Sequence, residues 1–301
     1  MPASESPQHP AARLRAIISG RKTVAVPGVF NPAVALLAQQ AGFECLYLSG
    51  AAFANSMGLP DLGVTTLTEV VEMTDRIASA APSTPLIVDA DTGFGEAVNV
   101  GRAVRMLERA GAAGLQIEDQ VMPKRCGHLE GKELVEPEEM VKKLVAAKAS
   151  SRRGIVLVGR TDAAETEGLE GAVERARLYR KAGADVIFPE ALRSKQEFAE
   201  FAKKVKGPLL ANMTEFGKTP YLSVEDFAGL EGYKLVVFPV TTFRAAMSAM
   251  RDVLDQLARS GSQKGSLKKL MTRDEFNDLV GYKSYAAADE STSRKAGAVT
   301  G

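Results

Sequence analysis

The sequence predicts an eight-stranded α/β barrel of the (β/α)8 TIM-barrel type, and three observations support this prediction. Segments rich in Val, Ile and Leu recur as continuous apolar runs, which is typical of strands covered on both faces in a parallel sheet. A segment with helical spacing follows each of these eight runs. Three of the helical segments end in QQAG, ERAG and RKAG, at Gly42, Gly111 and Gly183, where a left-handed C-cap is expected. Eight strand–helix units predict a closed barrel.

The elements follow one another in chain order. Strands are expected at residues 23–27, 45–49, 85–89, 114–118, 155–160, 185–189, 208–212 and 235–239. Helices are expected at residues 31–41, 68–80, 98–110, 137–150, 169–182, 194–205, 224–230 and 243–260. The first of these helices has Asn31 as a possible N-cap and Pro32 at its first position. The alternative is an open, doubly wound sheet. The count of eight units, with no GxGxxG motif after the first strand, favours the barrel.

Residues 1–301 are expected to form one domain. In this prediction the helices of residues 242–285 pack on the barrel or on a partner subunit, and residues 286–301 form a flexible tail. The 38 Lys and Arg residues balance 37 Asp and Glu residues, so we expect no nucleic-acid partner. No window approaches the ~18 consecutive apolar residues of a membrane span. The start lacks the apolar core of a secretory signal and the chain has two cysteines, so a cytoplasmic location is expected.

Polar residues follow the predicted strands at their C-terminal ends. These ends are SGA, DADTGFG, EDQ, GRTDA, PEA, NMTEFG and PVTTFR, whereas the opposite ends carry mostly Gly, Pro and Ala. Active sites of such barrels lie at the C-terminal ends of the strands. This asymmetry therefore predicts an enzyme.

A pair of aspartates ends the third strand. Asp89 and Asp91 are two residues apart, which places both carboxylates on one face of a strand. Such oxygen ligands suit Mg²⁺, and Glu118 and Asp119 on the next strand are candidates to complete its shell through water. The alternative is that the pair caps a turn and the following helix.

The longest connection, residues 120–136, carries a candidate reactive thiol. Cys126 follows Lys124 and Arg125 and precedes His128, and cationic neighbours are expected to lower the pKa of the thiol. Glycines at 127 and 131 permit the loop to hinge over a ligand. The alternative is a solvated basic turn with an incidental cysteine. Because His128 is one of only two histidines, a histidine-based triad or zinc site is not expected.

Three arginines are candidates to bind substrate carboxylates. Arg160 ends the fifth strand, Arg244 follows the eighth, and Arg273 lies further along the chain. Guanidinium groups bind carboxylates with two hydrogen bonds, although each arginine taken singly also fits a surface ion pair. Glu190 and Glu215 are either acids and bases or residues that hold loops together.

Ten sequence blocks together resemble one enzyme family. They are YLSGAA (47–52), GLPDLG (58–63), VDADTGFG (88–95), IEDQ (117–120), KRCGH (124–128), GRTDA (159–163), FPEA (188–191), NMTEFGKTP (212–220), FPVTTFRA (238–245) and MTRDE (271–275). In this order they resemble the 2-methylisocitrate lyases of the isocitrate lyase and phosphoenolpyruvate mutase superfamily. The resemblance runs from about residue 14 to residue 285.

The resemblance implies a cytoplasmic carbon–carbon lyase that cleaves (2S,3R)-2-methylisocitrate to pyruvate and succinate in the methylcitrate cycle of propionate catabolism. It implies a homotetramer with swapped C-terminal helices, and Mg²⁺, with Mn²⁺ as a substitute, held by Asp89 and Asp91. The catalytic residues it implies are Cys126 as the acid and, for the hydroxyl proton, Tyr47 or a metal-bound water near Glu118. The substrate-binding residues it implies are Ser49, Gly50, Ala51, Asp61, Cys126, Gly127, His128, Arg160, Glu190, Asn212, Met213, Thr214, Arg244 and Arg273. Ala51 stands where many members have Gly.

Other functions remain open at this point. Isocitrate lyase shares KxCGH but resembles a longer chain with inserted helices; other 2-hydroxy or 2-oxo dicarboxylate lyases share the barrel and the aspartates. A non-catalytic barrel scaffold is the alternative of a different class. The joint presence of Asp89, Asp91, Cys126 and the three arginines argues against a scaffold.

Overall fold

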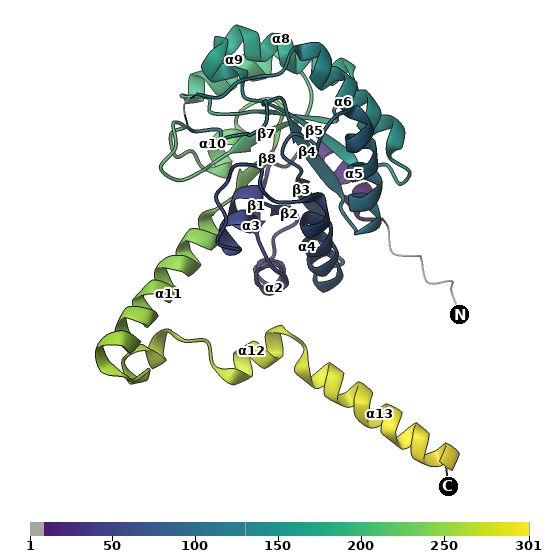
Figure 1. Ribbon diagram of the computed structural model, residues 1–301, viewed down its shortest axis with the longest axis vertical. Coiled ribbons are helices and arrows are strands. Elements are labelled where there is room, and N and C mark those ends of the chain that lie inside the picture. Colours follow the sequence, from purple (N-terminus) through teal and green to yellow (C-terminus); the bar gives the residue numbers. More distant parts are fainter. Residues whose placement is uncertain (1–8, 130, 301) are drawn as a thin grey trace. The chain divides into compact units, whose positions relative to one another are not determined.

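The eight parallel strands form a closed barrel. The computed structural model describes residues 9–129 and 131–300, without the side chains of 296–300. Neighbouring strands pair in chain order and β1 pairs with β8 (Figure 1). The strands are β1 (Val24–Val29), β2 (Leu46–Leu48), β3 (Leu86–Asp89), β4 (Gly114–Glu118), β5 (Val156–Thr161), β6 (Val186–Pro189), β7 (Leu209–Asn212) and β8 (Tyr233–Phe238). The predicted (β/α)8 fold is confirmed, and each predicted strand end lies within about two residues of the observed one.

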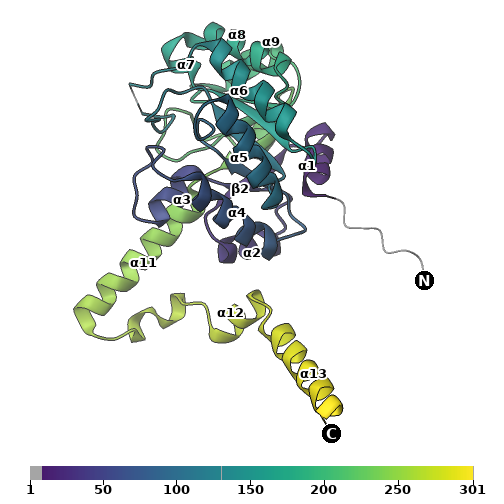
Figure 2. The same ribbon diagram turned by 45° about the vertical axis from the view of Figure 1, so that its right-hand side comes forward.

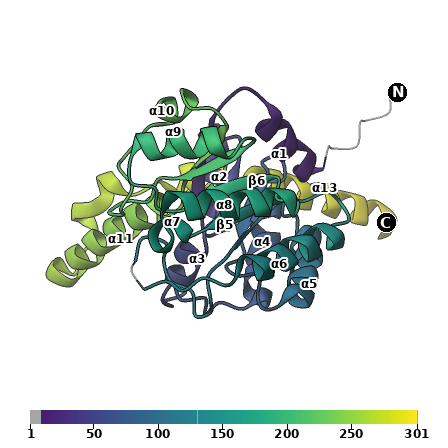
Figure 3. The same ribbon diagram turned by 90° about the horizontal axis from the view of Figure 1, so that it is seen from above.

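Helices surround the barrel (Figure 3). They are α1 (Pro10–Ser19), α2 (Pro32–Gln40), α3 (Gly50–Ser56), α4 (Leu67–Ala80), α5 (Ala97–Arg109), α6 (Pro137–Ser150), α7 (Ala163–Thr166), α8 (Gly168–Lys181), α9 (Lys195–Lys204) and α10 (Val224–Ala228). Figure 2 shows α5 and α6 side by side on the outside of the barrel. No helix within the described residues is long and apolar enough to cross a lipid bilayer.

Side chains alternate between the barrel interior and the layer under the helices. On β2, Tyr47 packs inside the barrel, whereas Leu46 and Leu48 pack against the helices. On β3, Ile87 points inward and Val88 outward. This period of two is the geometry of a strand. The next inward position after Ile87 is Asp89, at the C-terminal end of the barrel.

The chain divides into two compact units, residues 1–244 and 245–301. The second contains most of α11 (Thr241–Ser260), then the 3-10 helix η1 (Lys264–Lys269), α12 (Arg273–Leu279) and α13 (Tyr282–Thr300). Residues 286–300, expected as a flexible tail, are helical; their flexibility stays a prediction, and residue 301 lies outside the described residues. The packing of residues 242–285 on a barrel also stays a prediction.

Candidate active site

Inward-facing residues of several strands meet at the C-terminal end of the barrel. Arg160 of β5 is ion-paired with Glu118 of β4 and with Glu190, which follows β6. Asn212, the last residue of β7, donates a hydrogen bond to Glu190 Oε2 at 3.1 Å. Barrel closure therefore brings together polar residues that are up to 94 positions apart in the sequence.

The turn after β3 holds two aspartates side by side. Asp89 Oδ1 accepts a hydrogen bond from Asp91 N at 3.1 Å, and Asp89 Oδ2 accepts one from Gly50 N at 3.2 Å. A Cβ atom added to Gly50 would lie 3.0 Å from Asp89 Oδ2 and 3.4 Å from Asp91 Oδ1. Asp91 has a φ of 46°, and such left-handed conformations cost about 1 kcal/mol or more at non-glycine residues and cluster at active sites. The turn thus brings both carboxylates to the backbone of Gly50.

A buried ammonium group lies beside this pair. Lys124 Nζ is 2.8 Å from Asp91 Oδ1 and is also ion-paired with Asp61. Burial raises the pKa of Asp91 to about 6, an effect that Lys124 opposes. Burial therefore disfavours the ionised form of Asp91, and the nearby Lys124 ammonium group stabilises that form.

The same carboxylates fit a divalent metal ion. Asp91 Oδ1 and Glu118 Oε1 are buried oxygens that receive no well-directed hydrogen bond from the described residues. In the described part of the chain, no three His, Cys, Asp or Glu side chains form a metal cluster. Mg²⁺ is commonly held by one or two carboxylates with water and substrate as further ligands. The Asp89 and Asp91 pair suits that arrangement.

Asp119 does not face this site, and the expectation that it completes a metal shell is wrong. Its carboxylate accepts hydrogen bonds from Thr161 Oγ1 at 2.7 Å, Tyr179 Oη at 2.7 Å and Asp162 N at 3.0 Å. Successive strand residues point to opposite faces, so Glu118 faces the barrel interior and Asp119 faces the helices. Asp119 instead supports the end of β5.

Tyr47 and Glu118 are buried at the base of the site. The Tyr47 hydroxyl donates a hydrogen bond to Gln116 Oε1, and burial, with Asp89 adding, raises the pKa of Tyr47 well above its usual range. The phenol is therefore neutral at pH 7. Burial likewise raises the pKa of Glu118, against the opposing charge of Arg160. A carboxylate with a raised pKa takes up a proton more readily than free glutamate does, which suits proton transfer.

Arg160 is surrounded by three carboxylates. Its Nε lies 2.9 Å from Asp162 Oδ2 and 3.4 Å from Glu118 Oε2, and its Nη2 lies 3.2 Å from Glu190 Oε2. Burial alone would raise the pKa of Glu190, but Arg160 and His128 hold it well below its usual range. The guanidinium group is thus fixed as a cation at the end of the barrel, where it can bind a carboxylate.

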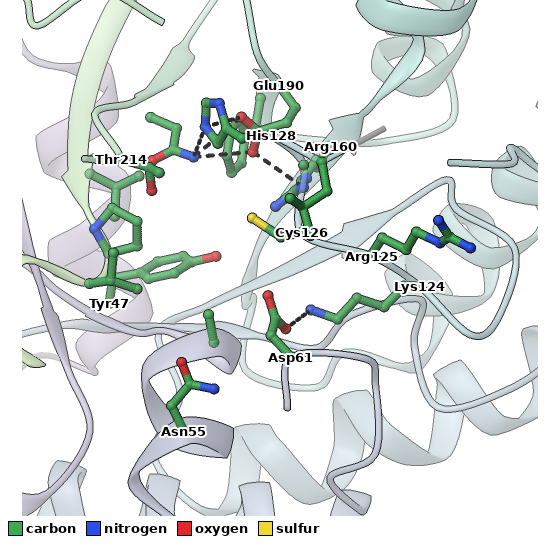
Figure 4. A pocket seen from close by; sticks show the side chains of 18 of the residues that line it. Tyr47, Asn55, Asp61, Lys124, Arg125, Cys126, His128, Arg160, Glu190 and Thr214 are labelled. Atoms are coloured by element: carbon green, nitrogen blue, oxygen red, sulfur yellow. Dashed lines mark hydrogen bonds and ion pairs between the residues drawn. The ribbon is translucent and has the colours of Figure 1, made fainter. Parts of the chain in front are cut away.

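The loop of residues 120–136 places three consecutive residues over this cluster. A Cβ atom on Gly127 would lie 2.5 Å from Arg160 Nη2 and 2.4 Å from Glu190 Cγ, so the close approach requires glycine. His128 Nε2 is 3.2 Å from Glu190 Oε1. Cys126, which precedes them, is partly buried at the cavity (Figure 4).

The expectation of a lowered pKa for Cys126 is wrong. Burial raises the pKa of this thiol above its ordinary value, and Glu190 and Asp61 add to the effect. Lys124, which the sequence places near the thiol, instead pairs with Asp61 and Asp91. Cys126 is therefore a neutral thiol at pH 7, the form required of a proton donor.

The residues after β7 and β8 form a further wall. Asn212 and Thr214 line the cavity, whereas the side chain of Met213 between them is buried in the core under the helices. The prediction that Met213 binds substrate therefore has no side-chain support. Arg244 Nη1 donates a hydrogen bond to Glu215 O at 2.7 Å and its guanidinium lies over the ring of Phe216. Arg244 also lines the cavity.

Three predicted site residues stand at the start of α3, with Ser49 at its N-cap followed by Gly50 and Ala51. Ser49 Oγ caps α3 by accepting a hydrogen bond from Ala52 N at 3.2 Å, while Ala51 faces the cavity. Gly50 contacts the Asp89 carboxylate. Arg273 is the first residue of α12 in the second unit, and its role stays a prediction.

The cavity has a volume of about 330 Å³. Figure 4 shows the hydroxyl of Tyr47 and the sulfur of Cys126 pointing into the same space, near Arg160. Predicted residues that line it are Tyr47, Ala51, Asp61, Cys126, Gly127, His128, Arg160, Glu190, Asn212, Thr214 and Arg244. Lining residues that the sequence analysis did not name as site residues are Asn55, Lys124, Arg125, Leu129, Phe188, Val237, Pro239, Val240 and Phe243. Most of these residues lie at strand ends or in the loop after β4, which was the available signal, whereas Asn55 lies on α3 and Phe243 on α11.

Comparison with known proteins identifies an enzyme family and similar relatives. The family model of phosphoenolpyruvate phosphomutase matches residues 14–258. A 2-methylisocitrate lyase of Aeropyrum pernix (strain K1) is 59% identical over 96% of this chain and 93% of its own length.

Solved structures give the same grouping. A crystal structure of 2,3-dimethylmalate lyase, described as a PEP mutase/isocitrate lyase superfamily member, has a TM-score of 0.89 and 37% identity over 94% of this chain and 95% of that chain. A phosphonopyruvate hydrolase, solved in complex with oxalate and Mg²⁺, has a TM-score of 0.85 and 32% identity over 94% of this chain and 98% of that chain. The chain therefore belongs to the phosphoenolpyruvate phosphomutase family, within the PEP mutase/isocitrate lyase superfamily.

Proposed function

We propose that this enzyme is a carbon–carbon lyase that cleaves (2S,3R)-2-methylisocitrate to pyruvate and succinate, a step of propionate breakdown in the methylcitrate cycle. The observation that carries the proposal is the cavity in which Cys126, Arg160 and Glu190 meet, next to the Asp89 and Asp91 pair. The similarity to a 2-methylisocitrate lyase over nearly the whole chain supports the choice of substrate.

The charges of the cavity suit a substrate with three carboxylates. Four cationic side chains line it, Lys124, Arg125, Arg160 and Arg244, against the carboxylates Asp61 and Glu190. Electrostatic complementarity of this kind favours a polyanion over a smaller monoanion. In this proposal Arg160, Arg244 and Arg273 bind carboxylates, and Asn212 and Thr214 donate hydrogen bonds to them.

Asp89 and Asp91 would hold Mg²⁺, with Mn²⁺ as a substitute. When bound, the ion would polarise the hydroxyl and the neighbouring carboxylate of the part that becomes pyruvate. The two aspartates meet at the backbone of Gly50. Glu118, whose Oε1 has no hydrogen-bond partner among the described residues, lies on the neighbouring strand β4. Lys124 would have to share Asp91 with the ion or release it.

Cleavage begins with removal of the substrate hydroxyl proton. Glu118 is the proposed acceptor because its Oε1 is buried without a hydrogen-bond partner among the described residues, and because its raised pKa favours proton uptake. Tyr47, neutral and bonded to Gln116, orients the polar groups beside it. These assignments make Glu118 the base and Tyr47 a hydrogen-bond donor.

The C2–C3 bond then breaks. Its electron pair moves to C3 and delocalises into the adjacent carboxylate, giving the aci form of succinate with three negative charges, while C2 becomes the carbonyl of pyruvate. The arginines and Asn212 stabilise the developing charge. The neutral thiol of Cys126 donates its proton to C3, which completes succinate. The loop of residues 120–136 excludes bulk water from this step.

Product analysis with and without Mg²⁺ tests the proposal. The purified protein is offered 2-methylisocitrate, isocitrate and 2,3-dimethylmalate, and pyruvate, succinate, glyoxylate and propionate are quantified. We expect Mg²⁺-dependent pyruvate and succinate from 2-methylisocitrate as the fastest reaction. Faster glyoxylate release from isocitrate would make it an isocitrate lyase. Turnover of none of them would favour a non-catalytic scaffold.

We also propose a cytoplasmic homotetramer in which C-terminal helices are exchanged between subunits. Among the described residues of α11, none is buried, and Met247, Met250 and Leu254 expose apolar side chains. Apolar helix faces of this kind mark interaction surfaces. Sedimentation of Leu254→Glu beside the wild type tests this proposal: smaller assemblies are expected, and an unchanged tetramer or a wild-type monomer would contradict it.

A further inference from the structure

The loop of residues 120–136 carries a buried lysine that the proposed mechanism does not use. The side chain of Lys132 is 0% exposed, and its Nζ lies 2.7 Å from Glu165 Oε2 and 3.4 Å from Asp162 Oδ1. It also donates a hydrogen bond to Gly127 O. Lysine is almost never fully buried unless it is paired. The loop therefore places a charged group in the interior where two carboxylates and a carbonyl receive it.

The same carboxylate binds a second loop. Glu165, on α7 after β5, is also ion-paired with Lys218, which follows β7. The backbone N–H of Lys218 donates a hydrogen bond to His128 Nδ1 at 3.0 Å. Glu165 thus connects the loop after β4 with the loop after β7, and both contact the segment of residues 126–128.

These contacts are next to the reactive thiol. Gly127, whose carbonyl Lys132 binds, is adjacent to Cys126 and packs against Arg160 and Glu190. Asp162 is shared, because it pairs with both Lys132 and Arg160. Neither Lys132 nor Glu165 lines the cavity. The contacts of Lys132 and Glu165 therefore affect the site only indirectly, by fixing the positions of Cys126 and Arg160.

We propose that Lys132 and Glu165 are positioning residues: they hold residues 126–128 over the cavity so that the Cys126 thiol faces the carbon to be protonated. The identity of that carbon rests on the proposed function. The placement of the thiol rests on the contacts alone.

Lys132→Met tests the proposal because it removes the ammonium group and keeps most of the side-chain volume. Each carboxylate retains another cation, since Glu165 keeps Lys218 and Asp162 keeps Arg160. The matched control is Lys148→Met. Lys148 is ion-paired with Asp185 at 3.2 Å. Asp185 directly precedes β6 and therefore lies at the opposite end of the barrel from the cavity. When Lys148 is replaced, Asp185 retains its ion pair with Arg15 at 3.1 Å.

The readout is the rate at which iodoacetamide alkylates Cys126 in the substrate-free enzyme, measured by peptide mass spectrometry. Cys45 is 0% exposed and provides an internal reference. Lys132→Met is expected to raise the rate about tenfold by releasing the segment, and Lys148→Met to leave it unchanged. In the cleavage assay, kcat of Lys132→Met is expected to fall about a hundredfold, with a smaller change in KM.

A folded Lys132→Met enzyme with the wild-type alkylation rate would overturn the proposal. If Lys132→Met does not fold, Glu165→Gln decides in the same assay: faster alkylation supports the proposal and an unchanged rate overturns it. Alkylation needs no substrate. If the wild-type enzyme fails to cleave 2-methylisocitrate while Lys132→Met is alkylated faster than the wild type, the proposed function is refuted and the positioning role stands.

Discussion

Cys126 is the residue on which the proposed chemistry depends, and its surroundings keep the thiol protonated. Burial raises its pKa above the ordinary 9.0, with Glu190 and Asp61 adding to the shift. A raised pKa means that the thiolate forms only at higher pH than in free cysteine. We therefore expect the alkylation rate of Cys126 to keep rising above pH 9.0. A plateau reached below pH 8, roughly the range of activated thiols, would contradict this account.

The aspartate pair carries the second prediction at this scale. Asp89→Ala removes one of two carboxylates that meet at Gly50, and with it a metal ligand. We expect titration with Mn²⁺, followed by electron paramagnetic resonance, to show binding by the wild type and at least about a hundredfold weaker binding by the variant, the loss that disturbed metal ligation typically causes. The control is Asp226→Ala, at a partly exposed aspartate that is paired with Lys195. Unchanged Mn²⁺ affinity in Asp89→Ala would place the metal elsewhere.

Residue types at strand ends were predictable, but their contacts were not. The positions of Asp89, Arg160 and Glu190 follow from the strand ends of a barrel. The surroundings of Cys126 depend on how its loop folds, and Lys124 turns away from the thiol to Asp61 and Asp91. Lys132 gave no signal, because its carboxylate partners lie about 30 positions away in the sequence and meet it only in three dimensions.

At the scale of elements, continuous apolar runs located every strand, since strands covered on both faces need apolar residues on both. The helices α1, α3 and α7 were not predicted. The last two have seven and four residues, too few for a helical period to show. Ser49 and Asp162 precede α3 and α7 as their N-cap residues, and both follow directly on a strand. The sequence predicted Ser49 as a substrate-binding residue, not as a helix cap.

Gly28 is the element-scale test of barrel closure. A Cβ atom there would lie 1.9 Å from Pro239 O, at the junction of β1 and β8. Backbone atoms of paired strands cannot move apart without loss of the ladder, so Gly28→Ala is expected to lower the free energy of unfolding by about 3 kcal/mol. Gly229→Ala, where the nearest atom is 3.6 Å away, is the control. Equal urea midpoints for both variants would contradict the close approach.

The whole molecule joins a barrel that presents a reactive thiol over a carboxylate pair to a separate C-terminal unit of helices. The barrel follows from the sequence because its eight units repeat one local pattern. The arrangement of the C-terminal unit does not, since the apolar face of α11 gives no information about which surface covers it. Membership of the phosphoenolpyruvate phosphomutase family covers residues 14–258.

The most direct measurement of the central claim compares Cys126→Ser with the wild type in cleavage of 2-methylisocitrate at saturating Mg²⁺. A serine hydroxyl is a far weaker acid than a thiol, so we predict that kcat falls by about 10² to 10⁴, the contribution of a general acid, while the melting temperature is unchanged. A folded Cys126→Ser enzyme that forms pyruvate and succinate at nearly the wild-type rate would contradict the claim that this thiol protonates the departing carbon.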